Sequence, residues 1–269
     1  MQKYLNKYKH TEVGVIPEDW DVKELGEICF PSKTRINPIT TDKNYKCSEQ
    51  SAIATVLSDT DALISNLEKL ISKKRLIKQG AMQQLLKPKK GWAVKKLGEV
   101  FSITAGGDLN FNNYSLIQDE NYRYPIYSNA LTNKGLYGFT SEYKQTENTI
   151  TVTARGQVGV ANPRDHKYSA IGRVIILNPI TNLNINFIAE YINNFIEFSN
   201  ESTGVPQLTA PQISKYEILF PKHDEQTEIA TILSDMDNGI TDLEKKLDKY
   251  KKIKQGMMQV LLTGKIRLV

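Results

Sequence analysis

The sequence predicts an α+β protein in which one mixed domain lies between two long helices that pair as an antiparallel coiled coil. Three observations indicate this class. A segment with a helical pattern occurs twice, both copies show a heptad pattern, and the residues between them include runs typical of strands and helices. We expect four parts. A short stub with a connector occupies residues 1–48, the first helix 49–90, the mixed domain 91–223 and the second helix 224–269.

The helical phrase at 49–86 recurs at 225–262, where a shift of 176 positions makes 22 of 38 pairs identical. A second match at a shift of 72 positions aligns WDVKELGEI at 20–28 with WAVKKLGEV at 92–100. The chain is therefore a doubled unit whose two middles differ in size. Residues 101–224 form a full body in the second copy. The 20 residues at 29–48 have two prolines and several polar turn formers, which favours a loop or connector in place of a lost domain.

Both copies carry apolar residues at alternating steps of four and three, which is the pattern of a coiled-coil seam. No proline interrupts either copy, and Pro88 ends the first helix. Each helix of 38 residues would span roughly 57 Å at 1.5 Å per residue. Such a seam needs a partner in water, and the nearest is the other copy. A body whose two ends lie close together favours the antiparallel pairing. The expected seam residues are Ile53, Leu57, Ile64, Leu67, Ile71, Ile229, Leu233, Met236, Ile240, Leu243 and Leu247.

The body between the helices mixes strand and helix patterns. Residues 148–154 (NTITVTA) and 172–177 (GRVIIL) are rich in β-branched residues and predict strands, as do 216–220. Residues 186–200 have apolar residues at helical spacing and predict a helix against the sheet. A short helical turn is expected at the prolines that precede the last strand.

Composition excludes several classes of protein. No run approaches the roughly 18 apolar residues of a membrane span, and the first residues lack the apolar centre of a signal peptide, so we expect a cytoplasmic protein. Cys29 and Cys47 have no metal-ligand spacing and are predicted to be unpaired thiols. Three scattered histidines offer no metal site. We expect no metal and no cofactor.

Positive charge is concentrated in the helices. The net charge is +5, yet residues 97–221 hold 8 basic and 11 acidic residues and carry 8 − 11 = −3, which leaves 5 − (−3) = +8 on the remainder. Residues 69–96 include ten Lys and Arg and no acid. This run is either a solvated helix face or a surface for an anionic partner.

With the repeat, the insert and their order established, the chain resembles the specificity (S) subunit of type I restriction-modification systems. The resemblance is carried by PEDWDVKELGEI and GWAVKKLGEV as domain openings, GVPQLTAPQISKYEILFP as a domain ending, DEQTEIATILSDMD as a helix start and IKQGMMQVLLTGKIRLV as a helix end. Together these motifs extend over most of the chain from Gly14 onward. Members of the family alternate target recognition domain, helix, domain, helix. This chain departs from that order because its first recognition domain is largely missing.

The resemblance implies a non-catalytic subunit of a DNA methyltransferase and endonuclease complex. In the family, the coil separates two recognition domains that each read half of a bipartite sequence in double-stranded DNA; roughly 57 Å corresponds to about 17 base pairs. Methyltransferase (M) subunits dock on it, bind S-adenosylmethionine and methylate adenine, and restriction (R) subunits join complexes that cut. With one recognition domain, the chain is a homodimer on a symmetric site, a reader of a half-site, or a remnant, and the sequence does not choose among them.

Base reading requires Arg, Lys, Asn, Gln or hydroxyl side chains in exposed loops. Polar loops of the body supply such residues, and Arg155, which lies between a predicted strand and two glycines, is the strongest candidate. The same residues are also ordinary for exposed turns. The expected DNA-binding residues are Asn129, Asn133, Lys134, Thr153, Arg155, Gln157, Arg164, Lys167, Thr203 and Gln207.

Nothing in the sequence indicates catalysis. RGQVGV at 155–160 lacks the Gly-Lys-Ser/Thr of a phosphate-binding loop and the pattern of a dinucleotide site. ANPR at 161–164 lacks the second proline and the aromatic residue of an adenine methyltransferase motif. The alternative to a DNA reader is a coiled-coil scaffold with a degenerate recognition domain, which binds partner subunits without sequence preference. A third hypothesis, an enzyme that acts alone, has no motif in its favour.

Overall fold

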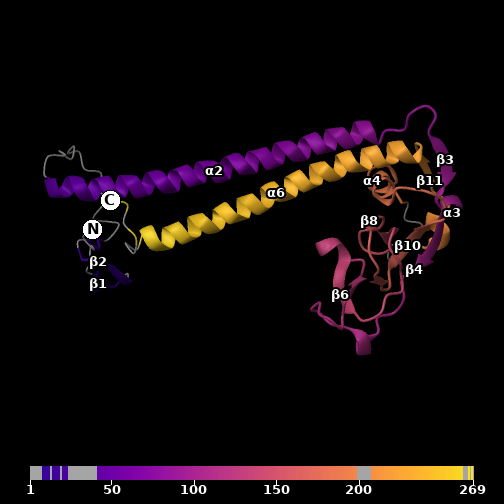
Figure 1. Cartoon of the computed structure of the whole chain (residues 1–269), viewed down its shortest axis with the longest axis horizontal. Helices are drawn as coiled ribbons and strands as arrows, with labels where there is room; N and C mark the ends of the chain where they lie inside the picture. Colours follow the sequence, from indigo (N-terminus) through magenta and orange to yellow (C-terminus); the bar gives the residue numbers. More distant parts are fainter. Residues whose placement is uncertain are drawn as a thin grey trace. The chain divides into compact units, whose positions relative to one another are not determined.

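A computed structural model describes residues 8–12, 14–18, 20–23, 41–198, 207–262, 266 and 268. By its internal contacts the chain forms two compact units. The coil unit contains the described residues of Met1–Ile77 and Met236–Val269, and the domain unit is Lys78–Asp235. Figure 1 shows their elements. None of the helices among these residues is long and apolar enough to cross a membrane.

Two long helices, α2 (Thr41–Leu85) and α6 (His223–Leu261), pair in antiparallel fashion in the coil unit. Three ion pairs establish the direction, because the residue number rises along α2 while it falls along α6. Asp61 Oδ1 lies 2.6 Å from Lys254 Nζ, and Glu68 Oε1 lies 2.7 Å from Lys251 Nζ. The third pair, Arg75 to Glu244, measures 2.5 Å. The predicted antiparallel coiled coil is confirmed.

The expected seam residues of the coil unit face the interior. Ile53, Leu67, Ile71 and Ile240 are buried. Half-buried positions complete the seam: Leu57, Ile64, Met236, Leu243 and Leu247. The exposed ion pairs beside this seam contribute little to stability, since each is screened by water. Burial of the apolar seam therefore supplies most of the free energy of pairing.

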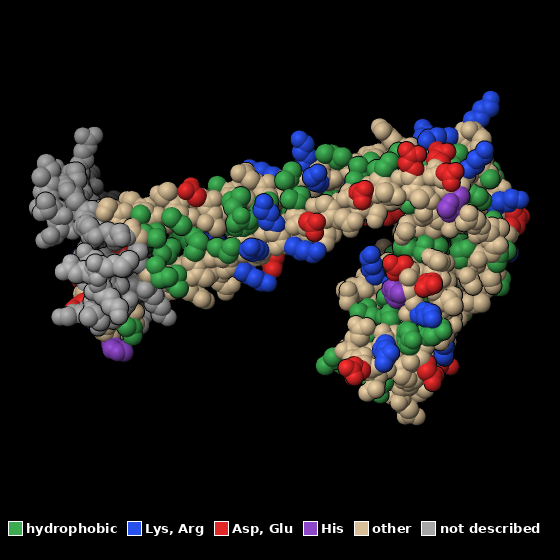
Figure 2. Space-filling model, viewed as in Figure 1, with side chains coloured by type: hydrophobic (Ala, Val, Ile, Leu, Met, Phe, Trp, Pro, Cys, Tyr) green, Lys and Arg blue, Asp and Glu red, His purple; other side chains and the backbone are tan. Residues whose placement is uncertain are grey.

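A second apolar row on α2 remains at the surface. Val56, Leu63, Leu70 and Ile77 recur every seven residues and are 37%, 37%, 40% and 52% exposed. Figure 2 shows apolar side chains along the long helices on the face that is turned to the viewer. The equivalent positions of α6 are Ile232, Gly239, Lys246 and Ile253. The two helices share a seam, and only α2 carries an unbroken second row.

The first helix starts earlier than expected. Residues 41–48 were predicted to belong to a connector, but α2 begins at Thr41, and this part of the prediction is wrong. Thr and Asp at 41 and 42 favour a helix start, and no proline or glycine follows before Gly80. The helix ends at Leu85, ahead of Pro88, as expected. Before α2, the strands β1 (Tyr8–Thr11) and β2 (Gly14–Pro17) form a small antiparallel hairpin.

In the part that the structure describes, the domain unit is an α+β fold with three sheets. Its main sheet has the order β4-β10-β7-β8, formed by β4 (Phe101–Ala105), β10 (Val174–Pro179), β7 (Thr149–Thr153) and β8 (Ala161–Arg164) in antiparallel register. A second sheet has the order β6-β5-β9, from β6 (Leu136–Thr140), β5 (Tyr124–Tyr127) and β9 (Ser169–Ala170). A third pairs β11 (Glu217–Phe220) with β3 (Ala93–Lys96). Short turns are α3 (Leu97–Val100), η1 (Phe111–Asn113), η2 (Thr132–Gly135) and α5 (Ala210–Ile213).

The amphipathic helix α4 (Ile185–Phe195) closes the core of the domain unit. Asn184 caps it by accepting hydrogen bonds from the backbone N–H groups of Asn186 and Phe187, both at 3.1 Å. Its buried face packs with the sheet strands, with the end of α2 and with the start of α6 in one hydrophobic cluster. The cluster includes the two seam residues of this unit, Ile229 and Leu233. The predicted strands at 148–154, 172–177 and 216–220 and the helix within 186–200 correspond to β7, β10, β11 and α4.

We predict that Leu67→Ala lowers the free energy of unfolding by about 2–4 kcal/mol, because it opens a cavity in the buried seam. Leu63→Ala is the matched control: Leu63 lies four residues away on the same helix and is 37% exposed, so its loss should cost less than about 1 kcal/mol. Urea unfolding followed by helical circular dichroism measures both. Equal effects would contradict the assignment of the seam.

Candidate nucleic-acid interface

Two polar loops and one later residue meet on the domain unit. The side-chain amide of Asn129 donates to the backbone carbonyl of Arg155 over 3.0 Å. Arg155 and Gln207 form an isolated antiparallel bridge, and the Leu208 N–H donates to the Ala154 carbonyl over 2.8 Å. The fold thus brings together Asn129, Arg155 and Gln207, which are far apart in the sequence. All three are capable of hydrogen bonds to base edges.

The loop at 128–135 presents its side chains from a tight backbone turn. The Ser128 N–H donates to the Gly135 carbonyl over 2.8 Å and closes the loop. Asn133 and Lys134 adopt φ of 51°, in the left-handed region that asparagine tolerates better than lysine does. A Cβ at Gly135 would lie 2.5 Å from the Ser128 carbonyl oxygen, so only glycine fits. Asn133 and Lys134 are consequently held out into solvent.

The turn between β7 and β8 presents Arg155 and Gln157. Thr153 Oγ1 accepts from the Val160 N–H over 3.0 Å and donates to the Gln157 carbonyl over 2.5 Å, which fixes the turn. A Cβ at Gly159, where φ is +92°, would lie 2.4 Å from the Phe198 ring. Gln157 is exposed and Arg155 is half-buried. Thr153, in contrast, is only 4% exposed. The expectation that Thr153 faces DNA does not fit its burial; its hydroxyl holds the turn that presents its neighbours.

Arg164 also lies inside the domain unit instead of facing solvent. It is 3% exposed, and its guanidinium carbon sits 3.4 Å from the centroid of the Tyr127 ring. Arg164 Nε donates to Thr151 Oγ1 over 2.9 Å and Nη2 donates to the Lys134 carbonyl over 2.6 Å. The expectation that Arg164 contacts DNA does not fit this burial. A buried cation must be hydrogen-bonded, and here its bonds fasten the 128–135 loop to the main sheet.

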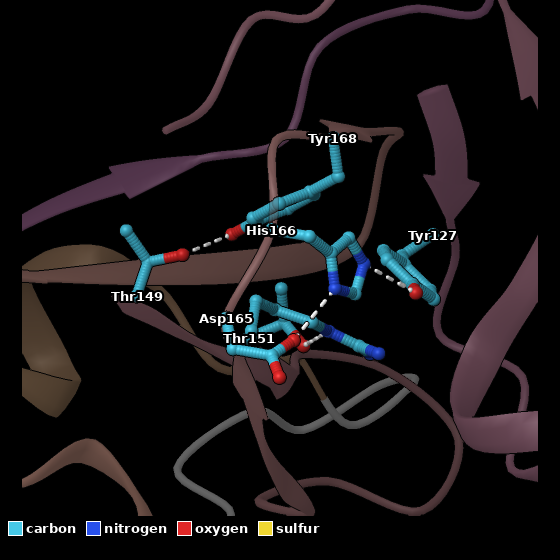
Figure 3. Close-up of polar contacts among 7 residues, drawn as sticks. Tyr127, Thr149, Thr151, Asp165, His166 and Tyr168 are labelled. Atoms are coloured by element: carbon cyan, nitrogen blue, oxygen red, sulfur yellow. Dashed lines mark hydrogen bonds and ion pairs between the residues drawn. The ribbon is translucent and has the colours of Figure 1, made fainter. Parts of the chain in front are cut away.

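A polar cluster surrounds this arginine, as the close-up in Figure 3 shows. The Tyr127 hydroxyl and His166 Nε2 are 2.9 Å apart, and His166 Nδ1 lies 2.7 Å from Asp165 Oδ1. The Tyr168 hydroxyl and Thr149 Oγ1 are 2.8 Å apart. The hydrogen bond from His166 holds the pKa of Asp165 below its usual range. Burial lowers the pKa of Arg164 and raises that of Tyr127.

Lys167 and Thr203 are the two remaining residues of the expected set. Lys167 is exposed, with Nζ 4.6 Å from the Tyr143 ring centroid, and the hydrogen bond to Tyr143 raises the pKa of its ammonium group. The lysine is therefore cationic, and its ammonium group lies over the ring of Tyr143. Thr203 lies outside the described residues. Each of these assignments to DNA contact stays a prediction.

Sequence reasoning missed Arg173. Its carbonyl accepts from the Ala154 N–H over 2.9 Å, which places its backbone beside the residue that precedes Arg155. Arg173 is exposed and adopts φ of 71°, a costly conformation for a side-chain-bearing residue. The run GRVIIL predicts only a strand, and β10 begins one residue after the arginine, at Val174. A Gly-Arg pair at the entry to a strand was the one available signal.

The described residues also bear on a possible metal site. Among the described parts of the chain, no three His, Cys, Asp or Glu side chains come close enough to hold a metal ion. The candidate interface is instead a set of amide and cationic groups at loop tips. Lys134, Arg155, Lys167 and Arg173 supply its positive charge in a body whose net charge is −3, so attraction to an anion has to be local.

These features define a class: one chain with an α+β domain that has polar loops and with two long helices in an antiparallel coil. Residues 89–255 match the family model described as type I restriction modification DNA specificity domain. The chain belongs to this family.

Relatives and solved structures agree with that assignment. A Mycoplasma pneumoniae protein named as a putative type I specificity subunit, S.MpnORF507P, is 28% identical over 188 residues, which make up 68% of this chain and 52% of that protein. The type I restriction enzyme MjaVIII specificity subunit of Methanocaldococcus jannaschii is 25% identical over 257 residues, or 82% of this chain and 60% of the relative. The chain thus spans about half of the first relative's length.

Two crystal structures share the fold. The S subunit of a type I restriction-modification system from M. genitalium has a TM-score of 0.61 at 20% identity, over 80% of this chain and 60% of that one. The HsdS subunit from Thermoanaerobacter tengcongensis has a TM-score of 0.56 at 15% identity, over 88% and 65% of the two chains. At these identities the likeness concerns the fold alone.

We predict that Arg164→Ala destabilises the domain unit by about 2–4 kcal/mol, because it removes a buried hydrogen-bonded cation and leaves the Lys134 carbonyl and Thr151 hydroxyl without their donor. Lys167→Ala, at an exposed site, should stay within about 0.5 kcal/mol. Thermal or urea unfolding compares the two. A stable Arg164→Ala protein that loses only DNA binding would show that Arg164 is a contact residue after all.

Alkaline pH should reveal the burial of Tyr168. Burial raises the pKa of its phenol from 10.0 to about 12. Between these values the unfolded chain releases the proton and the folded chain retains it, so stability that is complete below pH 10 is lost as pH rises towards 12. The loss should be on the order of 2–3 kcal/mol. Urea unfolding of Tyr168→Phe, which has no phenol, should show a shallower decline, and equal slopes would contradict the assignment.

Proposed function

We propose that this chain is the non-catalytic DNA sequence-specificity subunit of a type I restriction-modification complex, and that its one recognition domain reads a half-target in double-stranded DNA. The family match supports this role. The observation that carries it is the convergence of Asn129, Arg155 and Gln207 from three distant segments. Amide and guanidinium groups held at rigid loop tips suit base edges in the major groove.

The surrounding groups divide into two roles in this proposal. Arg155, Gln157, Asn129 and Gln207 are positioned for base edges, whereas Lys134, Lys167 and Arg173 are exposed cations suited to phosphates. Arg164 and Thr153 act indirectly, since each fixes the backbone of a loop that presents a contact residue. The loops are thus ordered before DNA arrives, which lowers the entropy cost of binding.

We further propose that methyltransferase subunits dock on the coil, where the exposed apolar row of α2 supports a protein partner. Val56, Leu63, Leu70 and Ile77 form an exposed apolar row at every seventh position of α2, and the basic run of the sequence begins within this stretch, at Lys69. Rows of this kind on a folded helix are typical of sites covered by another protein. Restriction subunits would join the resulting assembly. The proposed subunit supplies no reacting group of its own.

The direct test of DNA reading is binding to duplex DNA with the methyltransferase subunit present, followed by mapping of methylated adenines. Arg155→Ala should cost about 1–3 kcal/mol for the methylated motif and relax preference at one position, while Arg173→Ala should weaken all duplexes and reduce the salt slope by about one. Arg123→Ala is the control, because that exposed arginine bonds Glu120 of its own loop. Partner binding with no sequence preference would favour the scaffold alternative instead.

The docking surface predicts a separate effect. Leu63→Glu combined with Leu70→Glu should lower the affinity for the methyltransferase subunit by at least about 1.4 kcal/mol, a factor of ten, while the helix content is unchanged because both side chains are solvent-exposed. Asn66→Glu is the matched control, since Asn66 is an exposed residue of the same helix that does not belong to the apolar row. Pull-down with purified methyltransferase subunit measures both, and equal binding would overturn the site.

A further inference from the structure

The internal repeat places equivalent residues in the coil unit and in the domain unit, so the local surroundings of the two sets can be compared. At a shift of 176 positions the segment from Glu49 in α2 matches the segment from Glu225 in α6, and Leu262, directly after α6, matches Leu86, directly after α2. At a shift of 72 positions Trp20 matches Trp92. One set of these residues lies wholly in the coil unit and the other wholly in the domain unit. The comparison therefore concerns two separate local environments.

In the domain unit, the residues of this set pack against helix α4. The rings of Trp92 and Phe187 meet edge to face, with centroids 5.7 Å apart. Gln226 is 1% exposed: its Oε1 accepts from the Asn184 N–H and its Nε2 donates to the Pro221 carbonyl, both over 2.9 Å. The residues of this set that share one hydrophobic cluster with Phe187, Ile188 and Tyr191 of α4 are Leu86, Trp92, Ile229, Ala230 and Leu233.

In the coil unit, the same residue types line an open cavity of about 560 Å³. The lining residues that have these counterparts are Trp20, Gln50, Ile53, Ala54, Leu57 and Leu262. In the repeat, Trp20 is equivalent to Trp92, Gln50 to Gln226 and Leu262 to Leu86. Ile53, Ala54 and Leu57 stand for Ile229, Ala230 and Leu233.

The exposure of equivalent residues shows what the cavity lacks. Leu86 is fully buried at 0%, whereas Leu262 is 51% exposed. Gln226 is buried and doubly hydrogen-bonded, whereas Gln50 is exposed. Ala230 is buried and Ala54 is exposed. The residue types that seat α4 are present in both places; in the coil unit Leu262, Gln50 and Ala54 are exposed, while Ile53 is buried in the seam.

We propose that this cavity is a docking site for an α4-type helix from the recognition domain of a separate polypeptide. The required pattern is Asn-x-x-Phe-Ile-x-x-Tyr, which this sequence contains once, at 184–191. Phe187, Ile188 and Tyr191 are already buried in the core of the domain unit at 0%, 0% and 4% exposure. A folded second copy therefore has no such helix to offer. The partner is a polypeptide with a recognition domain whose equivalent helix is exposed. The aromatic face of that helix would pack against Trp20, and the backbone N–H of its N-cap residue would donate to Gln50.

This inference does not depend on DNA reading, so it is tested without DNA. The probe is a capped synthetic peptide of residues 183–196, with a hydrocarbon staple between positions 190 and 194. These two side chains already contact each other on α4, because the Asn194 amide donates to Glu190 Oε2 over 3.5 Å. The staple is needed because a free helix of this length is marginal in water. Circular dichroism verifies that the peptide is helical before it is titrated into the full chain.

Isothermal titration should give saturable binding of one peptide per chain. Leu262→Glu should weaken binding at least tenfold, and a peptide with Phe187→Ala and Tyr191→Ala should lose at least as much. Leu76→Glu is the matched control, since Leu76 is a 65% exposed leucine of α2 that does not line the cavity, and it should stay within twofold.

Two results would overturn the proposal. A helical peptide that shows no saturable binding, or that binds Leu262→Glu equally well, would show that the cavity is not a docking site for such a helix. A dimer of the chain alone that Leu262→Glu dissociates in analytical ultracentrifugation would show that a second copy fills the site, not a separate polypeptide.

Discussion

The pairing of two nearly identical apolar seams is the interaction on which the rest of the structure depends. Each seam exposes too much apolar surface to be stable alone, and the antiparallel partner buries it. The ion pairs Asp61–Lys254, Glu68–Lys251 and Arg75–Glu244 fix the direction more than the strength, since all lie in solvent. Antiparallel pairing of a repeated helix has a geometric consequence: the beginning of one copy always meets the end of the other.

That consequence explains how α4 is held within the domain unit and why a matching cavity exists in the coil unit. Leu86, from the end of one copy, and Ile229 with Leu233, from the start of the other, form one surface that α4 covers. Through the repeat, the equivalent residues Leu262, Ile53 and Leu57 line the cavity in the coil unit. The duplicated sequence thus repeats the residues that pack against α4. In the coil unit, one of these residues, Leu262, is half exposed.

Periodicity predicted the parts of the fold that are governed by burial along one element. The seam and α4 were predictable because their apolar residues recur at helical spacing, and β7 and β10 because they are rich in β-branched residues. Whether an individual polar side chain is buried or exposed was not predictable from periodicity. Arg164 and Arg155 occupy similar polar loops in the sequence, yet the first is buried over Tyr127 and the second reaches the surface, because a partner 37 residues away decides the outcome. Arg173 was hidden within a strand pattern, and its positive φ leaves no sequence signature.

Cross-linking tests the antiparallel pairing most directly. In a chain with Cys29→Ser and Cys47→Ser, cysteines at positions 68 and 251 should be joined within one molecule by a short bifunctional reagent, because Glu68 and Lys251 form an ion pair at 2.7 Å. Cysteines at 68 and 244, which the repeat would align in a parallel pairing, should react much less, since they are about seven residues or 10 Å out of register. Efficient joining of 68 to 244, or joining only between two molecules, would contradict the account.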